Sequence, residues 1–301
     1  MVVVLAGGTG GAKLARGMLD VVGAELTVVA NTADDVEIYG AYVSPDPDLC
    51  AFWLADRIDE RGWGLRDDSF HAMEQLRELG VDVWFELGDR DLAIGLRRAE
   101  RLRDGATLTE AIAELTKGLG LPARVLPMSD QPVRTRVLAR GRWLGFQEFM
   151  IRERAEGPVD GVELQGIEAA RAPEAVLEAI AGARAIVIGP SNPVISIRPI
   201  LDVPGIAAAL RATDAPVVAV SPIVGGQVLK GPTDDFMAWA GLPLSAAGVA
   251  GAYAPLIDGI VADEPVEEGE VVALQADTRM DDAAARRRVA AEVLDFAEGL
   301  R

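Results

Sequence analysis

The chain has 301 residues, half of them hydrophobic, and a formal net charge of −18 at pH 7. This length suits one large α/β domain, and the negative charge argues against duplex nucleic acid and anionic membrane as main partners. The single cysteine, Cys50, excludes a disulfide framework, and the single histidine, His71, excludes a multi-histidine zinc site. We expect a soluble cytoplasmic protein, because no leader pattern precedes the first strand and no apolar run approaches about 18 residues.

The first element is a buried strand that leads into a glycine-rich segment. Residues 1–6 are apolar and rich in β-branched side chains, which is typical of a buried strand. Four glycines follow within five positions, and the spacing over 13–22 predicts a helix. Glycine lets the backbone approach an anion, and a helix start offers unpaired N–H groups and a positive dipole end. We predict a phosphate cradle made by Gly8, Thr9, Gly10, Gly11 and Lys13.

This cradle departs from both standard nucleotide-binding fingerprints. A Walker A loop ends in Gly-Lys-Ser/Thr, whereas Ala-Lys-Leu stands at 12–14 and supplies no hydroxyl for magnesium. A dinucleotide fingerprint requires a glycine in place of Lys13 and an acid after the second strand, 26–30, which instead ends in Asn31. An NAD-dependent oxidoreductase is therefore disfavoured. The alternative for the glycines is tight packing of strand against helix, without a ligand.

Acidic residues cluster after the second strand. Asp34 and Asp35 follow it closely, and Asp46 and Asp48 lie in a Ser-Pro-Asp-Pro-Asp segment. Carboxylates beside a phosphate cradle suit Mg²⁺, which takes one or two of them together with phosphate oxygens. One carboxylate can also act as a base toward an attacking hydroxyl. The alternative is ordinary turn chemistry and a solvated acidic face.

The middle of the chain is mostly helical in pattern. Helices are predicted over 49–60, 69–79, 92–103 and 108–119, with short strands over 123–149. Thr107 and Glu110 predict a capping box for the last helix. Arg90 is expected on a loop, where it can reach a phosphate or form an ion pair, and Asp91 is expected to cap the helix after it. We interpret residues from about 47 to 149 as an insertion over the sheet edge within a single domain, 1–301.

Strand and helix patterns alternate again after residue 170. Strands are predicted at 185–188, 216–220 and 256–261, and helices at 171–181, 200–210 and 281–300. The loop after the first of these strands presents Ser191 and Asn192, and the loop after the second is followed by Lys230. Apolar strands that alternate with helices predict a Rossmann-like α/β fold, with a mostly parallel sheet covered on both faces. The loops after its strands should gather at one edge.

Short motifs occur in order along nearly the whole chain. They are Gly-Gly-Thr-Gly-Gly-Ala-Lys at 7–13, Asn-Thr at 31–32, Ser-Pro-Asp-x-Asp at 44–48, Gly-Trp-Gly at 62–64, Gly-Asp-Arg-Asp at 88–91, Leu-Pro-Met-Ser-Asp at 126–130, Gly-Pro-Ser-Asn-Pro at 189–193 and Ser-Pro-Ile-x-Gly-Gly at 221–226. In combination they resemble the 2-phospho-L-lactate transferase family. The family usually has Leu and Thr where Pro47 and Leu49 stand here, so no hydroxyl at position 49 takes part.

The resemblance implies a Mg²⁺-dependent enzyme of deazaflavin coenzyme F-420 biosynthesis. Such an enzyme moves a 2-phospholactyl or phosphoenolpyruvyl group from a guanosine diphosphate derivative to the deazaflavin precursor Fo and releases GMP. No residue decides between the two donors. The resemblance implies that the cradle and Asn31 bind the donor diphosphate, while Ser191 and Asn192 contact its guanosine end. It also implies a homodimer.

The same resemblance distributes the remaining roles. Metal ligands are expected among Asp34, Asp35 and Asp46. Catalytic roles are expected for Asp46 or Asp48, which orients the acceptor hydroxyl, and for Arg90, which supplies positive charge together with Lys13. An apolar slot for the acceptor is expected from the aromatic residues Phe52, Trp53 and Trp63, which are equally typical of a core. The second interpretation is a non-enzymatic regulator of a related family that binds nucleotide sugars.

Overall fold

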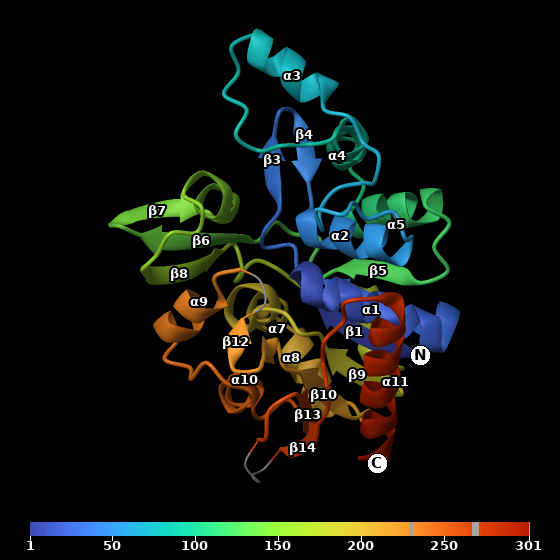
Figure 1. Ribbon diagram of the computed structural model, residues 1–301. Coiled ribbons are helices and arrows are strands. Elements are labelled where there is room, and N and C mark those ends of the chain that lie inside the picture. Colours follow the sequence, from blue (N-terminus) through green and yellow to red (C-terminus); the bar gives the residue numbers. More distant parts are fainter. Residues whose placement is uncertain (229–230, 267–270, 301) are drawn as a thin grey trace.

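A seven-stranded parallel sheet forms the centre of the molecule, in the order β14-β13-β10-β9-β1-β2-β5 (Figure 1). The structure is a computed structural model that describes residues 1–228, 231–266 and 271–300, so that Lys230 lies outside the described residues. The strands are β1 (Val2–Ala6), β2 (Leu26–Ala30), β5 (Arg124–Pro127), β9 (Ala185–Ile188), β10 (Val217–Val220), β13 (Gly259–Ala262) and β14 (Val272–Gln275). Every neighbouring pair is parallel, which confirms the Rossmann-like α/β fold.

The order of the strands reverses at β1. From β1 the sheet grows through β2 to β5 on one side, and through β9 to β14 on the other. In such sheets, ligands bind outside the carboxyl ends of the strands where the order reverses. The loops after β1 and β9 meet at this switch point, which is where the glycine segment and the 189–193 loop were expected to come together.

Helices cover both faces of the sheet. One face carries α1 (Gly8–Val22), α2 (Pro45–Leu54), α5 (Leu108–Gly118) and α11 (Ala283–Gly299), and the other carries α6 (Glu174–Ala181), α7 (Arg198–Asp202), α8 (Ile206–Ala212) and α10 (Ala246–Tyr253). Alternate residues of β1 divide between the two layers: Val2 and Val4 pack on one side, and Val3 and Leu5 on the other. This division explains why the strand is apolar throughout.

Smaller elements lie over the carboxyl edge of the sheet. They are the hairpin β3 (Val36–Ile38) and β4 (Ala41–Val43), the helices α3 (His71–Glu78) and α4 (Asp89–Arg103), and the antiparallel sheet β6 (Arg134–Ala139), β7 (Arg142–Gly145) and β8 (Val159–Gln165). Helix α3 projects at the top of Figure 1, in an arm that spans 69–88. The predicted insertion, 47–149, also contains α2, α5 and β5, which belong to the main sheet and its helix layer.

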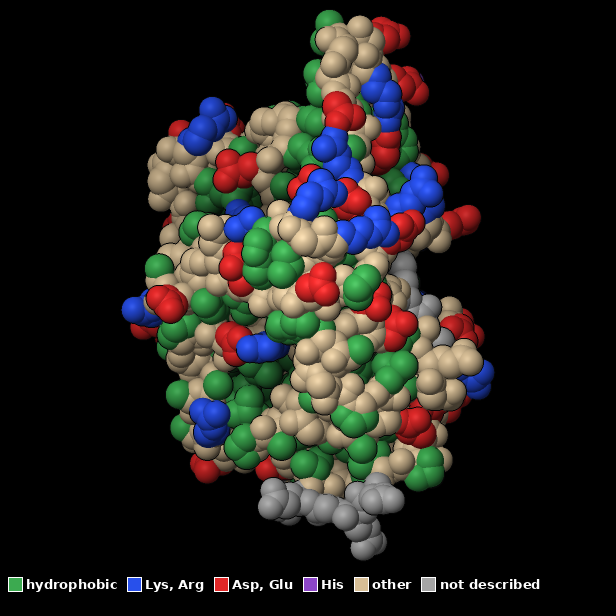
Figure 2. Space-filling model, turned by 90° about the vertical axis from the view of Figure 1, so that its left-hand side faces the viewer, with side chains coloured by type: hydrophobic (Ala, Val, Ile, Leu, Met, Phe, Trp, Pro, Cys, Tyr) green, Lys and Arg blue, Asp and Glu red, His purple; other side chains and the backbone are tan. Residues whose placement is uncertain are grey.

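Figure 2 shows the side of the molecule that carries the three-stranded sheet. Positive and negative side chains are interleaved over its upper half. Ion pairs join Arg136 to Glu163 within this sheet, and Arg140 and Arg142 to Glu156 and Glu153 in the segment between β7 and β8. This side therefore offers neither a continuous basic surface nor a continuous acidic one.

Several predicted boundaries were wrong for local reasons. Helix α2 begins at Pro45 and not at 49, because proline suits a first helical position and acids suit a first turn. The predicted helix over 200–210 is two helices, which are separated at Gly205, where φ is +106°. Helix α1 begins at Gly8, so the glycine segment is its first turn.

Among the described residues no single helix is long and apolar enough to cross a membrane, although the bent pair 193–202 and 206–212 meets the length and composition criterion jointly.

Helices α3 and α4 cap one another. The Asp68 carboxylate accepts hydrogen bonds from the N–H groups of Arg90 and Asp91, at 3.0 and 3.2 Å, at the start of α4. The Asp89 carboxylate accepts from His71 and Ala72, at 3.2 and 2.9 Å, at the start of α3. The prediction that Asp91 caps α4 was therefore wrong, because the Asp68 carboxylate, from the segment before α3, takes that place. The capping box of Thr107 and Glu110 is confirmed.

Candidate functional site

Three glycines of the first turn are required by close packing at the switch point. A Cβ on Gly7 would lie 2.6 Å from Ser196 Cβ, and one on Gly10 would lie 1.9 Å from the Pro190 carbonyl oxygen. A Cβ on Gly11 would lie 2.8 Å from Ser191 Oγ. The start of α1 thus packs directly on the loop after β9, and this contact by itself accounts for three of the four glycines.

Gly8 is the exception. Its φ is +65°, a conformation that favours glycine, and no heavy atom lies within 4 Å of the place where a Cβ would stand. The N–H groups of a first helical turn have no acceptor within the helix and carry the positive end of its dipole. Gly8 therefore opens the start of α1 toward space that an anionic group can fill.

Asp46 closes one side of this opening. Its Oδ1 accepts the Gly8 N–H at 2.7 Å, and its Oδ2 accepts Asn31 Nδ2 at 2.9 Å. Asn31 Oδ1 accepts the Ala33 N–H at 2.9 Å, so the amide is fixed at the end of β2. Burial raises the pKa of Asp46, and the hydrogen bonds from Asn31 and Gly8 oppose that rise. Asn31 thus orients a carboxylate at the start of α1.

Two further buried carboxylates lie beside Asp46. Asp35 Oδ1 accepts Ser44 Oγ at 2.8 Å, and burial raises the pKa of Asp35 to about 7 although Arg134 opposes the rise. Burial and the charge of Asp46 raise the pKa of Asp34 well above its usual range. One oxygen of each carboxylate, Asp34 Oδ1 and Asp35 Oδ2, is buried without a hydrogen-bond partner. The hydroxyls of Thr135 and Tyr42 also lower the pKa of Asp34 and of Asp35 as hydrogen-bond partners, so a ligand at these two oxygens would replace those contacts.

These carboxylates can hold Mg²⁺ only together with ligands that come from a bound phosphorylated substrate and water. Among the described residues, no three acidic, histidine or cysteine side chains are placed to hold a metal ion by themselves. Mg²⁺ requires only one or two carboxylates, with phosphate oxygens and water as its other ligands. The unpaired oxygens of Asp34 and Asp35 are ligands of that type, so the site suits a metal that binds together with a phosphorylated substrate.

Asp48 lies in a different environment from Asp46. Both of its oxygens accept hydrogen bonds from Arg98, one of them at 3.1 Å from Nη1. Arg98 is only 2% exposed, and its Nη1 also donates to the Tyr42 carbonyl at 3.0 Å. This ion pair joins α2 to α4, and it engages the carboxylate that was expected to orient the acceptor.

The two predicted cations lie on different helices, α4 and α1. Arg90 is exposed on the first turn of α4, eight residues before Arg98 and hence about 12 Å away along the helix axis. Lys13 lies on the second turn of α1, with its Nζ 5.9 Å from the centre of the Trp53 ring. Lys13 is therefore the closer of the two to the start of α1.

Two of the three predicted aromatic residues pack together, and the third lies outside their cluster. Phe52 is buried in a small cluster with Ile58 and Leu65, and Trp53 packs against that cluster. Trp53 also lies beside Lys13 and Arg286, whereas Trp63 is 40% exposed against Arg61. Phe52 and Trp53 therefore share a packing site to which Trp63 does not contribute.

Ser191 and Asn192 lie at the switch point, as expected, and bond within the protein. Ser191 Oγ accepts the Gly7 N–H at 3.3 Å. Asn192 Oδ1 accepts the N–H groups of Val194 and Ile195, at 2.9 and 3.2 Å, and its Nδ2 donates to Thr233 Oγ1 at 3.3 Å. Both side chains fix the loop that supports the glycines.

Four residues around the carboxylates were not predicted from the sequence. Thr135 is 2% exposed with an unpaired Oγ1, and Gln147 Nε2 donates to the Asp34 carbonyl at 3.0 Å. Arg134 donates to the Tyr42 hydroxyl at 3.1 Å. The alternation of buried and partly exposed residues over 134–139 was a usable signal, because it directs Thr135 inward. Three of these residues, Arg134, Thr135 and Gln147, line a cavity of about 420 Å³.

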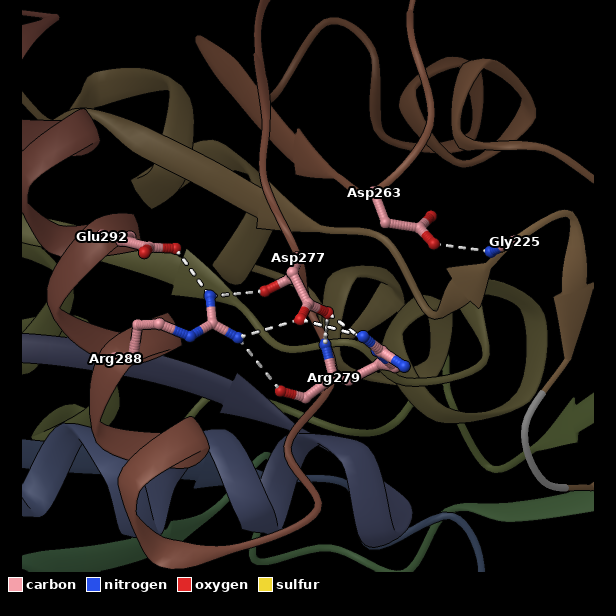
Figure 3. A network of polar contacts seen from close by, with 6 residues as sticks. All are labelled: Gly225, Asp263, Asp277, Arg279, Arg288 and Glu292. Atoms are coloured by element: carbon pink, nitrogen blue, oxygen red, sulfur yellow. Dashed lines mark hydrogen bonds and ion pairs between the residues drawn. The ribbon is translucent and has the colours of Figure 1, made fainter.

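A second cavity, of about 570 Å³, lies beyond the ends of β13 and β14. Figure 3 shows polar side chains in this cavity and beside it: Asp277 of the lining lies between Arg279 and Arg288, and Arg288 also reaches Glu292. Asp263 accepts the Gly225 N–H at 2.5 Å. The arginines drawn here are paired with acids, so this cavity is less suited to a phosphate than the start of α1.

The fold and the site define a doubly wound α/β protein with an acidic centre at the switch point of its sheet. A family model described as 2-phospho-L-lactate transferase CofD matches residues 2–295. The 2-phospho-L-lactate transferase of Methanosarcina mazei is 40% identical over 264 residues, which are 87% of this chain and 86% of that relative. The phosphoenolpyruvate transferase of Kitasatospora aureofaciens is 41% identical over 284 residues, which are 91% and 88% of the two chains.

This chain therefore belongs to the 2-phospho-L-lactate transferase family, and it is a transferase of coenzyme F-420 biosynthesis. A solved structure of a UPF0052 family member from Bacillus halodurans has a TM-score of 0.64 and 19% identity, and the match covers 97% of this chain and 99% of that one. At that identity the likeness shows a common fold alone.

Proposed function

We propose that this protein transfers a 2-phospholactyl or phosphoenolpyruvyl group from a guanosine diphosphate derivative to Fo, with Mg²⁺, and releases GMP. The observation that supports this proposal is the continuous set of polar groups at the switch point. It runs from the open start of α1 at Gly8, through Asp46 and Asn31, to the unpaired oxygens of Asp34 and Asp35. Relatives named for the two donors are 40% and 41% identical, so both donors remain in the proposal.

The donor diphosphate would lie at the start of α1. The N–H groups of its first turn suit phosphate oxygens, and Lys13 on the next turn adds a positive charge. Mg²⁺, when bound, would be held by Asp34 together with the donor, and it would neutralise charge on the transferring phosphoryl group. Asp46 would position the backbone at Gly8, and Ser191 would hold the loop beneath it.

The acceptor hydroxyl would approach from the side of the buried carboxylates. Its oxygen forms a bond to the phosphorus of the transferred group, the bond from that phosphorus to the GMP oxygen breaks, and the hydroxyl proton passes to a carboxylate. Asp35 suits that step, because a base is most effective when its pKa lies near the working pH. In this proposal Asp48 holds α2 against α4 through Arg98, and a catalytic role for Arg90 stays a prediction.

A product assay tests the function. The protein is incubated with Fo, Mg²⁺ and each of the two donors in turn, and the products are separated by chromatography. We expect one GMP for each Fo that is phosphorylated, with one donor at least. If GMP forms with neither donor although the guanosine diphosphate derivative binds, the enzyme proposal is wrong and the regulator interpretation takes its place.

A further inference from the structure

The Trp53 side chain lies where three helices of one layer meet. It belongs to the last turn of α2, and α1 packs against both α2 and α11, between which it lies in Figure 1. The backbones of α1 and α11 touch, because a Cβ on Gly17 would lie 2.2 Å from the Arg286 carbonyl oxygen. The Trp53 ring packs against the hydrophobic core under these helices, so it is held at a fixed place beside α1.

Two cations lie close to the Trp53 ring. Lys13 Nζ lies 5.9 Å from the ring centre, and Arg286 Cζ lies 5.1 Å from it. The negative face of an aromatic ring attracts a cation within about 6 Å of its centre, and tryptophan attracts cations most strongly. Lys13 belongs to α1 and Arg286 to α11, so the indole of α2 restrains a positive side chain from each of its two neighbouring helices.

The indole N–H of Trp53 makes its position costly for packing alone. Its Nε1 is buried, and no hydrogen-bond partner for it lies among the residues that the structure describes. A buried polar group without a partner destabilises the folded state. Phenylalanine would supply a ring without that cost, but its ring attracts cations less strongly. The advantage of tryptophan at this place is therefore its hold on the two cations.

Lys13 is the cation of α1 that can serve the start of that helix. Arg16, the other cation of α1, donates to both oxygens of Asp56 at 2.8 Å and to Asp20 at 2.6 Å. Lys13 follows Gly8 by five residues, about 7.5 Å along the helix axis, and long side chains on helices lean back toward the helix start. Ordering a lysine on binding costs side-chain entropy, and a contact that restrains it beforehand lowers that cost.

We propose that Trp53 is a positioning residue for donor binding: its ring restrains Lys13, so that the donor diphosphate at the start of α1 meets an ammonium group that is already ordered. The proposal rests on the proposed function, since it takes a guanosine diphosphate group as the ligand of Lys13. Trp53 then acts on the donor through Lys13, and not on the acceptor for which it was first expected.

The test measures GDP binding to the full-length protein by calorimetry, with Mg²⁺ present. Trp53→Leu keeps an apolar side chain and removes the ring, so it should raise the Kd for GDP about fivefold. Trp53→Phe keeps a weaker ring and should raise the Kd about twofold, while its melting temperature equals or exceeds that of the wild type. Trp143→Leu is the matched control, because Trp143 also lies beside an arginine, Arg136, but on β7 of the three-stranded sheet. It should leave the Kd unchanged.

A double-mutant cycle separates positioning from general packing. Lys13→Ala should raise the Kd for GDP, and adding Trp53→Leu to it should raise the Kd no further, because Trp53 acts through Lys13. In turnover, Trp53→Leu should raise the KM for the donor and leave both kcat and the KM for Fo near their wild-type values. Losses of GDP affinity that add in the double variant, or an equal loss in Trp143→Leu, would overturn the proposal. Wild-type or tighter GDP binding in a folded Trp53→Leu, or in Trp53→Phe if Trp53→Leu does not fold, would overturn it as well.

The outcomes separate this proposal from the proposed function. If GDP binding depends on Trp53 through Lys13 and the wild type forms no GMP with either donor, the role of Trp53 stands and the transfer reaction is wrong. If the wild type forms GMP and Trp53→Leu does so with an unchanged KM for the donor, the reaction stands and the role of Trp53 is wrong. A wild type that neither binds GDP nor forms GMP contradicts both.

Discussion

The Asp46 carboxylate lies 2.7 Å from the Gly8 amide nitrogen, and this hydrogen bond joins the first turn of α2 to the first turn of α1. Two helices therefore begin at one place, and their positive dipole ends converge on it. Asn31 holds the second oxygen of the same carboxylate, at the end of β2. The switch point of the sheet is thus organised around one buried acid, and the variants below separate its structural contacts from its chemistry.

The glycines of the first turn should respond differently to alanine. Gly10→Ala places a Cβ 1.9 Å from the Pro190 carbonyl oxygen, so we expect a large fall in melting temperature or loss of folded protein. Gly8→Ala meets no atom within 4 Å, and its positive φ costs about 1–3 kcal/mol. The Gly8→Ala protein should fold and bind GDP more weakly, as measured by calorimetry. Wild-type GDP affinity in that variant would remove Gly8 from the cradle.

Asp34→Asn should stabilise the protein and inactivate it. Burial and the charge of Asp46 raise the Asp34 pKa, so the ionised form is unfavourable in the folded state and a neutral amide of the same shape removes that cost. We expect a higher melting temperature at about pH 8 without ligands, together with a loss of GMP release. A fall in melting temperature would show that the Asp34 charge is compensated within the protein.

The ion pair of Asp48 and Arg98 should contribute to stability. Asp48→Asn leaves a guanidinium that is 2% exposed without its charged partner, which costs about 3–5 kcal/mol. Urea unfolding of Asp48→Asn should show a much lower midpoint. The Asp48→Leu/Arg98→Met double variant should lose less free energy of unfolding than the sum of the losses in its two single variants. Glu163→Gln is the control, because its exposed pair with Arg136 is worth about 1 kcal/mol or less. A stable, inactive Asp48→Asn would instead support the catalytic role first expected for Asp48.

Asp91 should make stability depend on pH. Burial, together with the charges of Asp48 and Asp68, raises its pKa to about 7. A carboxyl group whose pKa is higher in the folded state contributes stability that is fully present below its unfolded pKa of about 3.9. That contribution is lost as the pH rises through the folded-state pKa of about 7. The melting temperature of Asp91→Asn should therefore rise relative to that of the wild type as the pH increases from about 4 to 7. Above that range the difference in melting temperature should stay constant. Asp160→Asn, on an exposed part of β8, is the control, and an Asp91→Asn advantage that is the same at every pH would contradict the assignment.

The sheet was predictable because its strands are buried on both faces. Val2–Ala6 and Ala185–Ile188 are apolar throughout, and that pattern requires no knowledge of distant contacts. The edge strand Val272–Gln275 was missed, because its apolar run is short, ends at Leu274 and lies among polar residues, and the strand is mostly exposed. The hairpin of β3 and β4 was missed as well, since each of its strands has only three residues.

The gathering of the site at one edge was also predictable, because loops that follow parallel strands share an edge. The pairings inside it were not. Asp46 and Asp48 are two residues apart on one helix, yet one bonds to Gly8 and Asn31 and the other to Arg98, fifty residues away. Helix periodicity does not decide which neighbour each carboxylate meets, because that depends on how α4 packs.

Asp68 and Asp89 link the stability of the projecting arm to that of α4. When α3 detaches, Asp89 loses the N–H groups of His71 and Ala72, and when α4 frays, Asp68 loses those of Arg90 and Asp91. We therefore expect the arm and the first turn of α4 to open as one cooperative unit, whose amide hydrogens exchange with a common free energy. Helix α3 projects from the rest of the molecule in Figure 1, yet its stability, and that of Trp84 at its base, is tied to the stability of α4.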